Sequence, residues 1–214
     1  MIQLIDGFLS LVLLSILFSL GSGRLTVLFK VIAFQGIAVS IVPLLIGGRH
    51  VVFEDILFTL ATLLIRGVVI PYSIYLAIKK AAITSKFEPI VDYHASMFAG
   101  LLFMVVAALI SEKLMLPSMA GGKLLITASI ALLAGGMFIL MARRNAIAMV
   151  LGYIMMENGI YLVGTAFSVR ARHIVEFGIL LDVLAGVMIM AVILQNIKQR
   201  FNDVDTARLT TLKE

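Results

Sequence analysis

Long apolar stretches recur along this chain, and each is long enough to cross a lipid bilayer as a helix. They fall at about residues 7–22, 27–47, 54–78, 93–111, 122–142, 145–168 and 174–197. A spanning helix needs about 20 mostly apolar residues, since each residue adds about 1.5 Å across a hydrocarbon core of about 30 Å. Barrel strands would be shorter and would alternate in polarity, which these stretches do not. The sequence therefore predicts an all-α polytopic membrane bundle of about seven transmembrane helices.

The composition supports a membrane protein and excludes several kinds of site. Of the 214 residues, 62% are hydrophobic and 14% are charged, against roughly 45–50% and 25% in a soluble domain. The chain has no cysteine, which excludes disulfides and thiolate ligation of zinc or iron–sulfur clusters. We expect no cofactor or metal in this chain. The net charge of +5 is better explained by basic cytoplasmic loops than by a nucleic-acid partner.

The distribution of lysine and arginine predicts the orientation in the membrane, because basic residues collect in cytoplasmic loops. With seven spans, five basic residues fall on one side, and the larger group on the other side is Arg24, Lys30, Lys79, Lys80, Lys86, Arg143, Arg144, Lys198, Arg200, Arg208 and Lys213. We therefore expect a multi-pass protein of the cell (inner) membrane, with its N-terminus outside and its C-terminus cytoplasmic. The predicted units are a three-helix unit at 1–80, a linking segment with the fourth helix at 81–120, a second three-helix unit at 121–200 and a cytoplasmic tail at 201–214.

Three ionisable side chains fall near the middle of apolar stretches. Glu157 lies 13 residues from both Arg144 and Arg170, or about 20 Å from either end of a helix. Asp182 and Arg66 lie at similar depths in their own stretches. Each would cost roughly 2.5–3.5 kcal/mol if it faced lipid, so each should face the protein interior and find a partner. We expect Arg66 to pair with one of the two acids or with an acid of a neighbouring subunit.

The residues around these charges strengthen a functional interpretation. Tyr153, Glu157 and Tyr161 follow the i, i+4 spacing of one helix face. We predict a proton relay through Glu157 and Asp182, because two carboxylates and a guanidinium on different helices suit an ion path. The structural alternative is a set of buried hydrogen bonds or one salt bridge. The predicted supporting polar residues inside the membrane are Arg66, Tyr153, Asn158, Tyr161 and Thr62.

Two segments resemble the hydrogenase-4 component E family. Residues 152–159 read Gly-Tyr-Ile-Met-Met-Glu-Asn-Gly, and residues 176–182 read Glu-Phe-Gly-Ile-Leu-Leu-Asp. Within the second three-helix unit, 121–200, the basic loop and the following two carboxylates also resemble NuoK, a small membrane subunit of complex I. One departure is that an ungapped alignment of the basic loops places the first NuoK carboxylate opposite Ile154, about one turn before Glu157. Another is that the second NuoK glutamate is replaced by the shorter Asp182.

The resemblance implies a membrane-arm subunit of a complex I-like group 4 [NiFe] hydrogenase or formate hydrogenlyase. Such a chain is no enzyme by itself: the redox chemistry would occur in other subunits, and this one would contribute buried carboxylates to proton (or sodium) translocation. Its partners would be antiporter-like membrane subunits, the [NiFe] module reached through the membrane arm, and the lipid bilayer. Two alternatives stay open, a NuoK-like subunit of a multisubunit cation/proton antiporter and a membrane scaffold that translocates no ion.

Overall fold

The computed structural model of this protein describes residues 2–47, 53–72, 74–75, 90–114, 122–143, 146–167 and 186. Within these ranges the chain is helical and contains no β-strand. Five helices are long and apolar enough to cross a membrane. They are α1 (Ile2–Gly21), α2 (Leu25–Gly47), α5 (Tyr93–Lys113), α6 (Gly122–Ala142) and α7 (Ala146–Phe167). The predicted all-α fold is confirmed for this part of the chain.

The third apolar stretch forms a helix with a change of hydrogen-bond pattern in its middle. α3 (Phe53–Leu64) continues into a π-helical turn, η2 (Ile65–Val69), and helical residues follow to Tyr72. The backbone N–H of Ile70 donates to the carbonyl of Ile65, five residues earlier. Pro71 follows directly, and it has no N–H to donate to the carbonyl four residues earlier. A π-turn widens the helix locally and re-aims side chains, and such turns occur often at functional sites.

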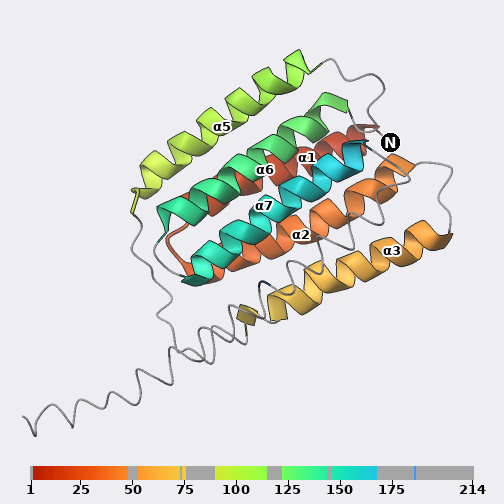
Figure 1. Cartoon of the computed structure of the whole chain (residues 1–214), viewed down its shortest axis with the longest axis horizontal. Coiled ribbons are helices and arrows are strands. Elements are labelled where there is room, and N and C mark those ends of the chain that lie inside the picture. The colour runs from red at the N-terminus through yellow and green to blue at the C-terminus, as the bar shows by residue number, and fades with distance from the viewer. Residues whose placement is uncertain are drawn as a thin grey trace, which may run out of the picture.

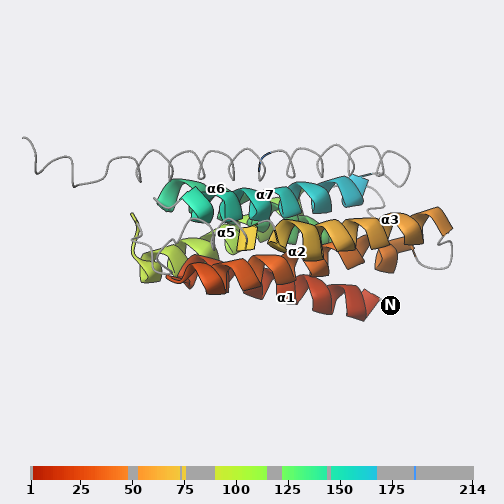
Figure 2. The ribbon, with the colours of Figure 1, turned by 90° about the horizontal axis from the view of Figure 1, so that it is seen from below.

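The helices lie side by side in one bundle (Figures 1 and 2). α6 and α7 make the most extensive contact, and α1 packs on α2, α5 and α6. α2 packs against both α7 and the α3–η2 segment. Figure 1 shows α5 and α3 at opposite edges of the bundle. The two predicted three-helix units thus pack against each other wherever the structure describes them.

Large apolar side chains cover the outer faces of both edge helices. Phe98 on α5 is 72% exposed, and Leu60 on α3 is 58% exposed. The side chains between α1, α2, α6 and α7 are buried, among them Leu9, Leu28 and Leu132. A bundle with an apolar core and an apolar periphery matches the bilayer as its surroundings, so the chain is a membrane protein. The predicted total of seven spans and the predicted orientation are not tested by these contacts.

Glycines allow α6 and α7 to approach at backbone distance. A Cβ atom on Gly136 of α6 would lie 2.6 Å from the carbonyl oxygen of Gly152 and 2.5 Å from the backbone nitrogen of Met156. A Cβ atom on Gly159 would lie 2.8 Å from the carbonyl oxygen of Ser129. Small residues of this kind permit close packing of transmembrane helices, where burial from water contributes little. The close approach of α6 fixes the rotation of α7 and therefore the direction in which its polar residues point.

Arg143 joins three helices at the end of the bundle that is predicted to be cytoplasmic. Its side chain is 2% exposed and donates hydrogen bonds to the carbonyls of Leu20, at 2.7 Å, and Val91, at 3.3 Å. The backbone N–H of Ile90 also donates to the carbonyl of Ala142. Burial lowers the pKa of the Arg143 guanidinium from its ordinary value, and the neighbouring Tyr93 partly offsets this effect. Arg143, which the charge distribution predicted only to be a basic loop residue, thus donates a hydrogen bond to a terminal carbonyl of α1.

Candidate functional site

An ion pair between the third and the sixth apolar stretches forms the centre of the candidate site. The Nη2 atom of Arg66, on η2, donates to the Oε1 atom of Glu157, on α7. Arg66 is 3% exposed and Glu157 is 2% exposed, so the pair is removed from both water and lipid. Glu157 lies eleven residues after the first residue of α7 and ten before its last. Arg66 is therefore paired with one of the two acids that were predicted as its partners from its depth and from the lack of an acid one turn away on its own helix.

Two further side chains of α7 hold the guanidinium. The Nη1 atom of Arg66 donates to the Oδ1 atom of Asn158 at 2.9 Å. The Cζ atom of Arg66 lies 4.1 Å from the ring centroid of Tyr161, as in a cation–π interaction. Tyr161 stands one turn after Glu157 on the same face of the helix. Asn158 and Tyr161, which the sequence indicated as supporting polar residues inside the membrane, thus both contact the guanidinium of the charged pair.

The other two supporting residues lie on the same helices, one turn before the charged residues. Thr62 of α3 is buried, and Tyr153 of α7 is half-buried. Beyond α7 the structure describes one residue, Gly186. A Cβ atom on Gly186 would lie 3.9 Å from Cε1 of Tyr153. The second predicted relay carboxylate, Asp182, lies outside the described residues, as do the rest of the predicted seventh span and the tail.

Several polar atoms of this site have no hydrogen-bond partner among the described residues. They are Oε2 of Glu157, Nε of Arg66 and Nδ2 of Asn158. A buried polar atom without a partner costs free energy, and most native structures contain few of them. Three such atoms lie around one ion pair, which is where this site departs from ordinary buried polar groups. Oε2 of Glu157 is the carboxylate oxygen that can accept a proton while Oε1 stays bound to Arg66.

Gly36 of α2 lets η2 approach the site, which the sequence analysis did not anticipate. A Cβ atom on Gly36 would lie 3.5 Å from the carbonyl oxygen of Arg66 and 3.6 Å from its Cβ. The neighbouring Gln35 is fully buried, and its Nε2 atom donates to Oγ of Ser15 on α1 at 2.8 Å. The signal for both contacts in the sequence is the polar–glycine pair Gln35-Gly36 within an apolar stretch. A helical wheel shows which face of the helix carries this pair, but it does not show which residues the pair contacts.

The part of the chain that the structure describes contains no group of three or more His, Asp or Glu side chains that could hold a metal ion. The chain has no cysteine. What the site offers chemically is one carboxylate, one fixed positive charge and hydrogen-bonding groups, all buried in the bundle. This set can hold and release a proton, and it contains no nucleophile with an adjacent general base.

Comparison with known proteins supports one part of the sequence interpretation. No protein-family model matches this chain, and no solved structure matches it. Hydrogenase-4 component E of Escherichia coli K12 and of Shigella flexneri each match at 29% identity over 112 residues, which is 52% of this chain and 52% of the relative. The chain is similar to hydrogenase-4 component E. The predicted resemblance is thereby confirmed, over about half the length of these relatives, while likeness to NuoK stays a prediction.

A longer match has no described role. The "Uncharacterized protein Rv0085" of Mycobacterium tuberculosis is 26% identical over 193 residues, covering 89% of this chain and 87% of that protein. The similarity to this protein therefore extends over nearly the whole chain. The similarity to a relative with a functional name, hydrogenase-4 component E, covers about half of the chain.

Proposed function

We propose that this chain is a membrane-arm subunit of a complex I-like group 4 [NiFe] hydrogenase or formate hydrogenlyase of the inner cell membrane. In this proposal, redox chemistry occurs in other subunits, and this chain carries protons (or sodium) through buried carboxylates. The similarity to hydrogenase-4 component E supports membership of a multisubunit hydrogenase assembly. The observation that carries the transport role is the Arg66–Glu157 pair in the middle of the bundle.

The energetics of this pair favour a functional role over a purely structural one. Removing two charges from water costs several kcal/mol per ion. After this cost, a buried ion pair often stabilises a protein no more than a well-packed apolar pair of similar volume. Two neutral side chains would therefore join η2 to α7 at a lower cost. A carboxylate that is retained at this depth is explained if it must change its protonation state.

Each residue of the site has a distinct part in the proposed relay. Glu157 accepts the proton on Oε2, the oxygen that Arg66 leaves unbound. Arg66 stays charged throughout, since a guanidinium does not lose its proton at any relevant pH. It therefore acts as a fixed charge that holds Glu157 in place and disfavours a second cation nearby. Asp182 would be the next carboxylate on the path.

The experiment that tests this proposal separates ion movement from electron transfer. Glu157→Gln keeps the size and hydrogen bonding of the side chain and removes the charge that a proton neutralises. In the assembled complex, we expect electron transfer to an artificial acceptor to survive and the measured proton-to-electron ratio to fall. The matched control is Glu112→Gln, at the exposed end of α5, which should leave the ratio unchanged.

A scaffold role is the second candidate, because Arg66 is bound on three sides by residues of α7. Such a clamp would also serve to fix η2 against α7. The scaffold role predicts that Glu157→Gln weakens assembly and leaves the proton-to-electron ratio of the surviving complex intact. That result would remove the relay proposal and leave the scaffold.

A further inference from the structure

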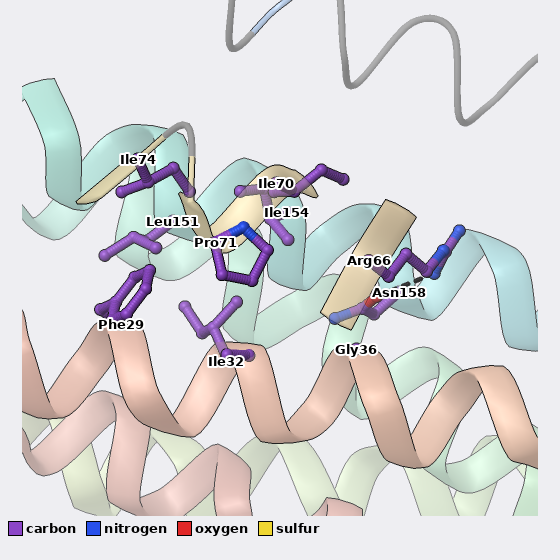
Figure 3. Close-up of a pocket in the computed structure, with 11 residues that line it drawn as sticks. Phe29, Ile32, Gly36, Arg66, Ile70, Pro71, Ile74, Leu151, Ile154 and Asn158 are labelled. Atoms are coloured by element: carbon purple, nitrogen blue, oxygen red, sulfur yellow. Dashed lines mark hydrogen bonds between the residues drawn. The ribbon is translucent and has the colours of Figure 1, made fainter. Parts of the chain in front are cut away.

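A narrow crevice lies within the bundle beside Arg66, the basic residue of the Arg66–Glu157 pair. It lies between α2, the segment from η2 to Ile74, and α7 (Figure 3). Phe29, Ile74 and Leu151 line one end of this crevice, which is named its outer part, and Gly36, Arg66 and Asn158 line the opposite end, which is named its inner end. Along all three helices, the outer residues are those nearer the end where α2 and α7 begin. That end is the predicted cytoplasmic side of the membrane.

The inner end of the crevice carries a hydrogen-bond donor without a partner. Asn158 is fully buried, and Nδ2 has no partner among the described residues. Its Oδ1 atom is bound to Arg66, so the amide nitrogen points the other way. Figure 3 shows this nitrogen on the side of Ile32 and Pro71, within the crevice. A buried amide donor of this kind needs an acceptor.

A backbone acceptor lies close to the same inner end. The carbonyl oxygen of Arg66 lies 3.5 Å from the place that a Cβ atom on Gly36 would take, and both residues line the crevice. The five-residue pattern that binds Ile70 to Ile65 would next bind residue 71 to Arg66. Residue 71 is a proline, which has no N–H to donate. A water molecule here would accept from Asn158 and donate to Arg66, and two polar partners are the fewest that hold a buried water, about three being typical.

We propose that this crevice is the path by which water, and with it protons, reaches the Arg66–Glu157 pair from the end of the bundle where α2 and α7 begin. The inference rests on the proposed function for its purpose, while the access itself is a separate property. The apolar walls between mouth and inner end make a narrow passage that wets only transiently, which is a known way of gating ion movement. Glu157 would then exchange protons with one side of the membrane only through this passage.

A lipid chain is the competing occupant, and the polar inner end argues against it. A hydrocarbon tail fits the apolar walls but offers no acceptor to Asn158 and no donor to the carbonyl of Arg66. Water satisfies both groups. The lipid occupant also predicts reactivity toward lipid-soluble reagents alone, so one experiment distinguishes the two occupants.

The absence of cysteine from the chain makes accessibility labelling direct. In the complete complex in native membrane vesicles, Ile74→Cys and Ile154→Cys place a thiol in the outer and the inner part of the crevice. Val68→Cys, on η2 but 59% exposed at the periphery, is the matched lipid-facing control. The hydrophilic probes are Ag⁺ and methanethiosulfonate ethyltrimethylammonium, whose fixed charge keeps it on one side of the membrane, applied to vesicles of either orientation. N-ethylmaleimide is the lipid-soluble reagent.

We expect both crevice thiols to react with the hydrophilic probes severalfold faster than Val68→Cys, and faster from the side where α2 begins. Ala33→Leu, which fills the crevice between the two positions, should slow the reaction at Ile154→Cys and spare Ile74→Cys. Val27→Leu, on the exposed face of α2, should change neither rate. Reaction of the crevice thiols with N-ethylmaleimide alone, or hydrophilic rates no faster than the control, overturns the proposal. Neither result depends on whether Glu157→Gln changes the proton-to-electron ratio, so the access path and the relay can fail separately.

Discussion

Arg66 donates a hydrogen bond to Glu157 across 91 positions of the chain, and both side chains are almost completely buried. This contact joins η2 in the first half of the chain to α7 in the second half. The residues around it come from α2, η2 and α7, so the site exists only when the two halves of the bundle are packed together. Predictions about stability and about ion movement therefore converge on the same few residues.

Removing the guanidinium should destabilise the bundle strongly. Arg66→Leu leaves Glu157 buried without its partner, and breaking one side of a buried ion pair costs about 3–5 kcal/mol. Arg66→Lys retains the charge but loses the two-pronged contact with Glu157 and Asn158, so its effect should be smaller. The measurement is the thermal stability of the purified complex in detergent, together with the amount of this chain in membranes.

The matched double variant isolates the pair itself. Arg66→Leu combined with Glu157→Leu removes both charges, and most of the stability lost in the single variant should return. Arg24→Leu, which removes an exposed arginine, should have little effect. If Arg66→Leu alone is as stable as the unaltered chain, the contact contributes nothing to the fold.

Gly136 is predicted to be the position in α6 least tolerant of a methyl group. A Cβ atom there would overlap the backbone of Gly152 and Met156, and backbone cannot move aside as a flexible side chain can. Gly136→Ala should cost about 1–3 kcal/mol through overpacking. Gly7→Ala in α1, where nothing lies within 4 Å of the added atom, should be neutral or stabilising, since alanine favours a helix interior by about 1 kcal/mol over glycine. Thermal unfolding of the two variants side by side is the measurement, and equal losses would contradict the close approach of α6 and α7.

Pro71 is predicted to maintain the π-turn that presents Arg66 to Glu157. Pro71→Ala supplies the missing N–H, so the ordinary four-residue pattern becomes available and the π-turn should shift or disappear. Arg66 would then turn away from α7. The readout is the coupling energy of the Arg66→Leu and Glu157→Leu cycle, measured with and without Pro71→Ala, and we expect Pro71→Ala to lower it severalfold. Pro43→Ala, in α2 where no π-turn is present, should leave the coupling unchanged.

Much of this architecture follows from two properties of the sequence. The bilayer sets the length of an apolar stretch, so six of the seven predicted stretches coincide with observed helices, and the end of the third, at 78, lies outside the described residues. The cost of charge in lipid then restricts where Arg66 and Glu157 can point, and with few charges at mid-depth the pairing could be anticipated. Residues four apart lie on the same face of a helix, so Tyr161 was expected on the face of α7 that carries Glu157. The structure places its ring beside Arg66, the partner of Glu157.

What could not be predicted depends on the exact register between helices. The π-turn at Ile65–Val69 changes the register by a fraction of a turn, and Pro71 alone indicates a disturbance without its form. Nothing local to Gly36 or Gln35 indicates that one lies beneath Arg66 and the other binds Ser15. The burial of Arg143 under the end of α1 was likewise hidden, because an arginine in a short loop is ordinarily read only for its charge.

The last prediction concerns Asp182, the second carboxylate of the proposed relay. Gly186 lies beside Tyr153, and the predicted seventh span would run antiparallel to α7. Four residues are about one helical turn, so Asp182 should lie level with Glu157, one turn after Tyr153. In this cysteine-free chain, Glu157→Cys with Asp182→Cys should be bridged by a short bifunctional thiol reagent. Tyr153→Cys with Gly186→Cys provides the positive reference.

The control pair is Met155→Cys with Asp182→Cys, because Met155 faces Gly135 of α6 rather than Arg66. Bridging at 153–186 and 157–182 but not at 155–182 would place both carboxylates on one path, about one side chain apart. A proton on Oε2 of Glu157 could then pass to Asp182 without leaving the protein interior. Bridging at 153–186 alone would put Asp182 on another face, and the two carboxylates could not exchange a proton directly.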